Sequence, residues 1–119
     1  MRETGDQFEE RAAAMVLDAG FAIIDRNFNT KVGEIDIIAH SSETLVFIEV
    51  RARSNTRFHG AAASVSRSKQ QRLIRTAQYY LKSHPRWRNS HCRFDVIAFE
   101  PPQSNSEQSV RWIEGAFTA

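Results

Sequence analysis

Apolar residues recur at helical spacing among polar ones in the N-terminal part of the chain. Thr4 and Gln7 have the spacing of a capping box, and Gly20 is a residue type that commonly ends a helix. Between these two signals, the apolar positions that fall on one helical face are Phe8, Ala12, Val16 and Ala19. The pattern predicts an amphipathic helix over residues 4–19.

Three segments rich in β-branched and aromatic residues follow this helix. Residues 21–29 form the first segment, and Gly33 lies in the expected turn after it. Glu34–His40 and Leu45–Arg51 form the second and third segments. The polar residues 41–44 lie between these two strands, so we expect a β-hairpin with a four-residue loop.

This hairpin has a register that can be predicted from its loop. If His40 pairs with Leu45, residues that lie opposite each other have numbers that sum to 85. Two pairs of charged residues then face each other across the ladder: Asp36 with Glu49, and Glu34 with Arg51. Alternation sends these four side chains to one face of the sheet and an apolar set to the other: Ile35, Ile37, Ala39, Val46, Ile48 and Val50. On the charged face Ile38, Leu45 and Phe47 continue the core, so the acids lie at one end of otherwise buried strands.

The second half of the chain predicts one helix and two further strands. A polar, then alanine-rich connection over 52–63 precedes a helix that begins near Ser64 or Ser66 and ends at His84. We expect strands over 93–99 and 110–114, with a loop over 101–109 between them. The order αβββαββ indicates a single domain over residues 1–119, in which a mixed sheet is flanked by helices. Its fold class is α/β, on the border of α+β.

Composition excludes several classes of protein. Hydrophobic residues make up 41% and charged residues 25% of the 119 residues, which is typical of a globular domain. No apolar run is long enough for a membrane span or a secretory signal, so we expect a cytoplasmic protein that does not bind membranes. The one cysteine, Cys92, excludes an internal disulfide and a cysteine-ligated zinc site.

Charge is distributed unevenly along the chain. Residues 51–93 contain eleven Lys and Arg side chains and no Asp or Glu, although the whole chain has a net charge of only +2. Such segregation is typical of a surface that contacts nucleic-acid phosphates. The arginines expected to contact them are Arg53, Arg57, Arg67, Arg72 and Arg75. The alternative is a solvated basic helix and loop. Tyr79 and Trp87 could stack on unpaired bases, but packing is the favoured role for both.

The expected Asp36–Glu49 pair carries the candidate chemistry. Two carboxylates on opposite strands repel each other unless a proton or a cation lies between them. Their hard oxygen ligands suit Mg²⁺ or Mn²⁺. The alternative is that both acids lie in a solvated rim and form ion pairs with Arg51 or Arg93. Asp95 is expected mainly as an ion-pair partner of Arg93.

Several motifs in this order resemble a known family. Gly33-Glu34-Ile35-Asp36 followed by Phe47-Ile48-Glu49-Val50-Arg51 resembles the Asp…Glu-x-Lys signature of the PD-(D/E)XK, restriction-endonuclease-like nucleases. Across nearly the whole chain, the sequence resembles the bacterial YraN-like family, which is similar to Holliday-junction resolvases. The residues that carry this resemblance are Gly5, Glu9, Ala12, Arg26, Asn27, the two motifs above, Lys69 and Arg93-Phe94-Asp95-Val96.

The resemblance implies an αβββαβ core of the restriction-endonuclease-like type, with a metal at Asp36 and Glu49. It also implies Glu9 as a further ligand, although Glu10 and Asp6 on the same helix are ordinary solvated acids. The departure from the nuclease pattern is Arg51, which stands where the motif has lysine. Arginine stays protonated, so it is a poor base, and a cross-strand ion pair with Glu34 is an equal alternative. A catalytic role for Arg51 would be to stabilise charge in the transition state.

Lys69 is the candidate replacement for that lysine. It falls on the apolar stripe of the second predicted helix, four residues before Leu73, so its charge points toward the sheet. The alternative is that Lys69 extends to solvent. The leading interpretation is metal-assisted hydrolysis of phosphodiesters in DNA, including branched DNA, with Asp36, Glu49, Arg51 and Lys69 as the catalytic set. A DNA-binding module without activity is the second interpretation, and a protein-interaction adaptor is the third. A homodimer would present two sites to the two strands of a junction.

Overall fold

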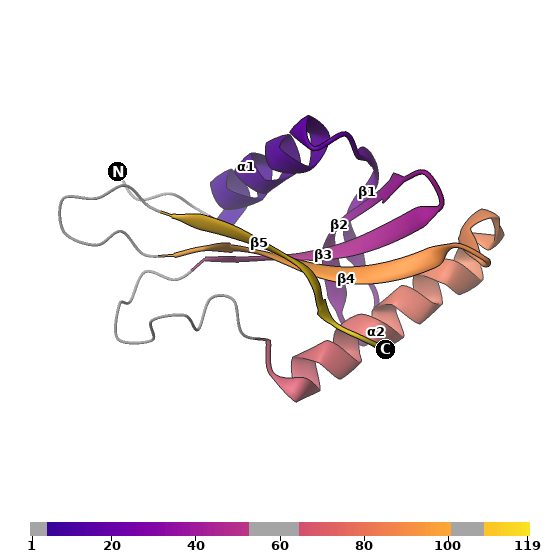
Figure 1. The fold of residues 1–119 in the computed structure, drawn as a ribbon. Helices are drawn as coiled ribbons and strands as arrows, with labels where there is room; N and C mark the ends of the chain where they lie inside the picture. Colours follow the sequence, from indigo (N-terminus) through magenta and orange to yellow (C-terminus); the bar gives the residue numbers. More distant parts are fainter. Residues whose placement is uncertain (1–4, 53–64, 101–108) are drawn as a thin grey trace.

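The computed structural model describes residues 5–52, 65–100 and 109–119. Within these ranges the elements follow the predicted order, with one additional 3₁₀ turn (Figure 1). Their bounds are α1 (Gly5–Asp18), β1 (Ala22–Asn29), β2 (Glu34–Ser41), β3 (Thr44–Ala52), α2 (Arg67–Ser83), η3 (Pro85–Trp87), β4 (His91–Phe99) and β5 (Val110–Phe117). β5 is three residues longer than the sequence predicted. Of the two predicted connections, nearly all of 52–63 and all of 101–109 except Ser109 lie outside the described residues.

The five strands form one mixed sheet in the order β1-β2-β3-β4-β5. Neighbouring strands are antiparallel except β3 and β4, which run parallel because the chain crosses from one to the other through α2. The two helices lie on opposite faces of the sheet (Figure 1). Neither described helix combines the length and the apolar character that crossing a membrane requires.

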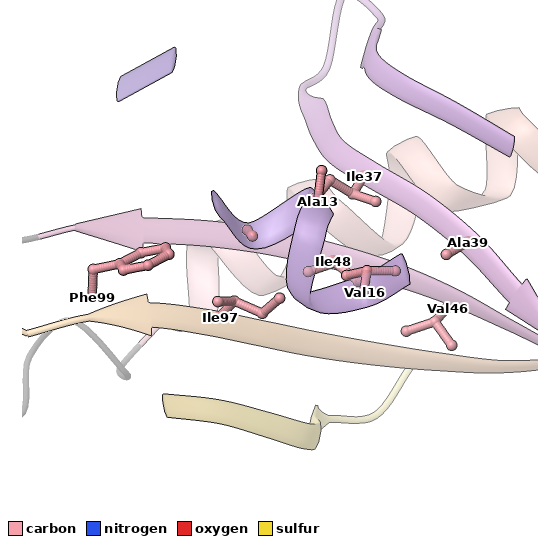
Figure 2. Close-up of a cluster of buried hydrophobic side chains, with 9 residues drawn as sticks. Ala13, Val16, Ile37, Ala39, Val46, Ile48, Ile97 and Phe99 are labelled. Carbon is pink, nitrogen blue, oxygen red and sulfur yellow. The ribbon is translucent and has the colours of Figure 1, made fainter. Parts of the chain in front are cut away.

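Each face of the sheet carries its own core. Under α1, Ala12, Ala13 and Val16 pack on β2, β3 and β4 (Figure 2). The sheet residues of this cluster are Ile37, Ala39, Val46, Ile48, Ile97 and Phe99. Under α2, the buried cluster consists of Ile35, Ile38, Leu45, Phe47, Leu73, Ala77, Tyr80 and Phe94. The three central strands β2, β3 and β4 are therefore buried on both faces, as the sequence predicted for Ile38, Leu45 and Phe47.

The predicted hairpin register is confirmed where the ladder forms. Five pairs run from Ile37↔Ile48 to Ser41↔Thr44, and the numbers in each pair sum to 85. Ser41 and Thr44 pair with each other, so the connection is a two-residue turn and not the predicted four-residue loop. Ser42 takes a left-handed conformation in this turn, with φ 52°. The predicted pairing of Glu34 with Arg51 is not part of this ladder, which ends at Ile37↔Ile48.

One prediction about β2 is wrong: Ile35 does not share a face with Ile37. Ile35 packs in the cluster under α2, whereas Ile37 packs under α1. The regular alternation of side chains is therefore broken at Asp36, the residue between them. On β1 the position between the partners of Ile35 and Ile37 is Asn27, which has a left-handed φ of 54°. Both strands thus depart from regular geometry at the same level of the sheet.

Asp95 holds β5 against β4 at the point where the register of these two strands shifts. Its buried carboxylate accepts hydrogen bonds from Arg93 Nε and Nη2, Trp112 Nε1 and the Gly115 backbone N–H, at 2.8–3.0 Å. These bonds span the point where the β4–β5 register shifts, between Phe94 and Val96. The predicted Arg93–Asp95 ion pair is confirmed, and its role is to hold the edge strand.

Candidate active site

A cleft of about 180 Å³ lies between α2 and the ends of β2 and β3 that lead away from their shared turn. The irregularity at Asp36 and the N-terminal turns of α2 bring charged side chains of both signs into it. Its lining residues are Gly33, Glu34, Asp36, Glu49, Lys69, Arg72 and Leu73. Four of these residues were predicted from the sequence for the charged region: Glu34, Asp36, Glu49 and Lys69.

The carboxyl groups of Asp36 and Glu49 lie close enough for each to shift the pKa of the other. Glu49 is 7% exposed, and Asp36 Oδ2 accepts a hydrogen bond of 2.7 Å from the Val50 N–H. The Asp36 side chain thus supplies the acceptor for β3 just beyond the last β2–β3 pair. The two acids do not lie in a solvated rim, so that alternative is wrong.

Burial and mutual repulsion change the ionisation of this pair. Burial first, and the charge of Glu49 second, raise the pKa of Asp36 to about 8 against the lowering effect of the Val50 N–H. Burial also raises the pKa of Glu49, although the Lys69 ammonium and the hydrogen bond from Asp36 oppose this. The pair therefore holds one proton near neutral pH and carries about one negative charge between its two carboxyl groups.

Lys69 points toward the sheet, as the sequence predicted. Its Nζ lies 3.5 Å from Glu49 Oε1, and its side chain is 39% exposed, so the ammonium lies at the mouth of the cleft. The start of α2 fixes this position, because Ser66 caps the helix by accepting a hydrogen bond from the Lys69 backbone N–H at 3.1 Å. Extension of Lys69 to bulk solvent, the alternative, is not what the structure contains.

Arg72 joins the cleft one helical turn after Lys69. Arg72 was predicted from the sequence only as a phosphate contact, although its three-residue spacing from Lys69 indicates a shared helical face. Close contact between α2 and the β1–β2 turn positions this face. A Cβ atom at Gly33 would lie 2.9 Å from Thr76 Oγ1, so only glycine allows the two segments to approach this closely.

Glu9 is held by a different partner. Its Oε1 lies 3.4 Å from Arg26 Nη2, and the same guanidinium bonds Glu10 at 2.8 Å through Nη1. The charge of Glu9 is still close enough to contribute to the raised pKa of Asp36. Among the described residues, no three or more His, Cys, Asp or Glu side chains lie together in a group that could hold a metal ion. The structure thus brings Asp36 and Glu49 together but leaves Glu9 with Arg26.

The predicted basic residues fall in three places. Arg67, Arg72 and Arg75 are exposed on α2. Arg53 and Arg57 lie outside the described residues. Arg51 lies on β3, where its parallel-ladder partner is Ala98, and it is not among the residues that line the cleft. Within the described residues, no ion pair joins Arg51 to Glu34 or to the two carboxyls of the cleft.

Comparison with known proteins adds the family. The family model described as "Uncharacterised protein family UPF0102" matches residues 8–99, which include the whole cleft. The chain belongs to the UPF0102 family. This family is the YraN-like family that the motifs predicted, whereas the relation to nucleases stays a prediction.

Relatives in this family align over almost their full length. A UPF0102 protein of Alcanivorax borkumensis is 46% identical over 118 residues, which cover 98% of this chain and 92% of the relative. A UPF0102 protein of Saccharophagus degradans is 43% identical and is covered to 93%, and one of Methylobacillus flagellatus is 38% identical over the full length of both chains. The family assignment therefore applies to the chain as a whole.

Proposed function

We propose that this protein is a metal-dependent nuclease that hydrolyses phosphodiester bonds in nucleic acid, with DNA as the first substrate to test, and that it acts in the cytoplasm. The observation that carries the proposal is the pairing of half-buried Asp36 with buried Glu49, together with Lys69 and Arg72, in one cleft. Two carboxyl groups that are removed from bulk water and share one proton lower the stability of the folded protein, which is costly to maintain for structure alone. Groups that lower the stability of the fold in this way are more frequent at functional sites.

The oxygen donors of the cleft fit a divalent cation. The Asp36 and Glu49 carboxylates, with the Val50 backbone carbonyl, would hold Mg²⁺ or Mn²⁺, because these hard cations prefer oxygen ligands. Such a cation, when bound, supplies Lewis-acid activation of the phosphate and of the attacking water. It would also offset both the burial and the repulsion by Glu49 that together raise the pKa of Asp36 to about 8. Glu9, held 3.4 Å from Arg26, is available only if that ion pair opens.

The cations of α2 would act on the substrate. Lys69 is a compact ammonium at the mouth of the cleft, where it would contact a non-bridging phosphate oxygen and stabilise charge in the transition state. Arg72 would hold a neighbouring phosphate through its planar guanidinium. The exposed Arg67 and Arg75 continue the positive surface along the helix. Contacts of this kind read the backbone and not the base sequence.

Arg51 lies outside the set of residues that line the cleft, so Lys69 is the stronger candidate for the role of the motif lysine. A binding module without turnover is the competing proposal, since position 51 departs from the nuclease pattern. The two proposals differ in what a carboxylate substitution does. The nuclease should lose cleavage but keep nucleic-acid binding, while the module should show no cleavage at all.

The test is cleavage of labelled linear, nicked, flapped and four-way-junction DNA with Mg²⁺ or Mn²⁺. Wild type, Asp36→Ala and Glu43→Gln are purified identically, because Glu43 is an exposed acid in the β2–β3 turn and controls for the loss of one charge. We expect wild type and Glu43→Gln to cleave and Asp36→Ala to be inactive. Cleavage by all three would identify a contaminant. No cleavage by wild type on DNA or on matched RNA would contradict the proposal in favour of the module.

A further inference from the structure

A second and larger hollow lies along the C-terminal half of α2. Its volume is about 880 Å³, and its walls come from α2, the β1–β2 turn and the segment after η3. The lining residues are Val32, Arg75, Gln78, Tyr79, Leu81, Lys82 and Arg88, and none of them lines the carboxylate cleft. We call this hollow the α2 groove.

The lining of the α2 groove contains positive charges and no acids. Arg75, Lys82 and Arg88 contribute three cations, and no carboxylate is among the lining residues. Within the described part of the chain, none of the three forms an ion pair, although Arg26, Lys69, Arg93 and Arg111 all do. Three unpaired cations around one hollow favour a polyanionic occupant over a neutral one.

Tyr79 gives the groove an exposed aromatic ring. Its side chain is 53% exposed, whereas its neighbour Tyr80 is 2% exposed and packs under α2. Trp87 behaves as the sequence analysis favoured, because its ring packs against His40 and Arg86. Tyr79 does not follow that expectation. An exposed large aromatic ring beside cations is the arrangement by which proteins bind unpaired nucleotides, with bases stacked on the ring and phosphates held by Lys and Arg.

We propose that the α2 groove binds single-stranded nucleic acid, with a base stacked on Tyr79 and the backbone held by Arg75, Lys82 and Arg88. This proposal rests on the proposed function and narrows its substrate class. Lys69 in the cleft and Lys82 in the groove are thirteen residues apart on one helix, about 20 Å at 1.5 Å per residue. A strand that enters the cleft therefore continues unpaired along α2. The favoured substrates have a single-stranded stretch beside the cleavage point, as flaps and open junctions do.

The experiment measures binding of a fluorescein-labelled oligothymidylate by anisotropy in EDTA, so that cleavage plays no part. We expect Tyr79→Ala to weaken binding about five- to tenfold, and Tyr79→Phe to bind as wild type, since stacking on an aromatic ring contributes about 1–3 kcal/mol per base. Arg75→Ala and Lys82→Ala should each lower the slope of log K against log salt by about 0.7, the value for one lost phosphate contact on a single strand. Arg111→Ala, an exposed cation on β5, is the matched control and should leave both quantities unchanged.

Two outcomes would overturn the proposal. The first is wild-type affinity and salt dependence for all the groove variants, with circular dichroism showing each variant folded. The second is a loss of specificity for unpaired bases, seen either as an equal loss of duplex and single-strand binding in Tyr79→Ala, because the ring would then not select unpaired bases, or as equal displacement by polyglutamate, because charge alone would then govern the groove. The proposed hydrolysis is tested separately, by cleavage. If groove variants lose oligothymidylate binding while wild type never cleaves, the groove stands and the nuclease does not.

Discussion

Replacing Asp36 with asparagine should make the metal-free protein more stable at neutral pH. Asparagine has the shape of aspartate, so its carbonyl oxygen can accept the hydrogen bond from the Val50 N–H. Its amide can also donate to the ionised Glu49 carboxylate, which lies beside Lys69. What the substitution removes is the repulsion between the carboxyl groups of half-buried Asp36 and buried Glu49.

The magnitude follows from the pKa of Asp36, which burial and the charge of Glu49 raise from 3.8 to about 8. Between these two pH values the unfolded chain releases a proton that the folded protein keeps, so stability falls as pH rises and levels off above about 8. At pH 7, which is about 3 pH units above 3.8, the loss of stability is at most about 4 kcal/mol, at about 1.36 kcal/mol per pH unit. Hydration of the open cleft reduces this value, and we expect about 2 kcal/mol. The raised pKa of Glu49 acts in the same direction.

The assay is urea unfolding in EDTA at several pH values from 4 to 9, with wild type, Asp36→Asn and the control Glu43→Gln. Asp36→Asn should exceed wild type by about 2 kcal/mol near pH 8, or about 8 °C in Tm for a domain of this size, and the difference should shrink toward pH 4. Glu43→Gln should follow wild type throughout. Equal stability of wild type and Asp36→Asn at pH 8, or a wild type that gains stability between pH 5 and 8, would refute the reasoning.

Three further predictions concern the cation, the edge strand and the helix–turn contact. Mg²⁺ or Mn²⁺ at a hundred times its Kd should stabilise wild type by about 2.7 kcal/mol but leave the Tm of Asp36→Asn unchanged, and equal shifts would argue against a site at the carboxyl pair. Asp95→Ala should lose about 3 kcal/mol in thermal unfolding and speed hydrogen exchange in β5, because it leaves buried donors without their acceptor; slow exchange in β5 would contradict this. Gly33→Ala should lose about 1–3 kcal/mol, because its Cβ would lie 2.9 Å from Thr76 Oγ1. Gly5→Ala, with nothing within 4 Å, is the control, and equal Tm values for the two variants would disprove the close contact.

Much of the fold could be predicted because the hairpin carries two consistent signals. Alternation of apolar residues sets the faces of β2 and β3, and the polar stretch between them limits where the chain can turn. The register that pairs His40 with Leu45 follows from both. Lys69 could be placed in the same way, since a charged residue on an apolar helical stripe must lie near a compensating group.

The remaining features depend on contacts between distant residues. Nothing in the local pattern around Ile35 and Ile37 indicates that they pack on opposite faces, because the irregularity involves Asn27 on the neighbouring strand. Glu9 is similar: its pairing with Arg26 depends on how α1 lies against β1. Helical periodicity does separate Tyr79 from the stripe of Tyr80, but the groove beside it forms only when the β1–β2 turn approaches α2.

The parallel pairing of β3 with β4 has a consequence for how the cleft assembles. Asp36 and Glu49 lie on one hairpin, whose short-range contacts form early in folding, whereas Lys69 and Arg72 arrive only through the long crossover that carries α2. Where α2 packs onto a hairpin that has already formed, we expect the loss of water around the two carboxyl groups to be accompanied by uptake of a proton. In the absence of a divalent cation, folding should then be faster in mildly acidic solution than at pH 8, which stopped-flow refolding at the two pH values would measure.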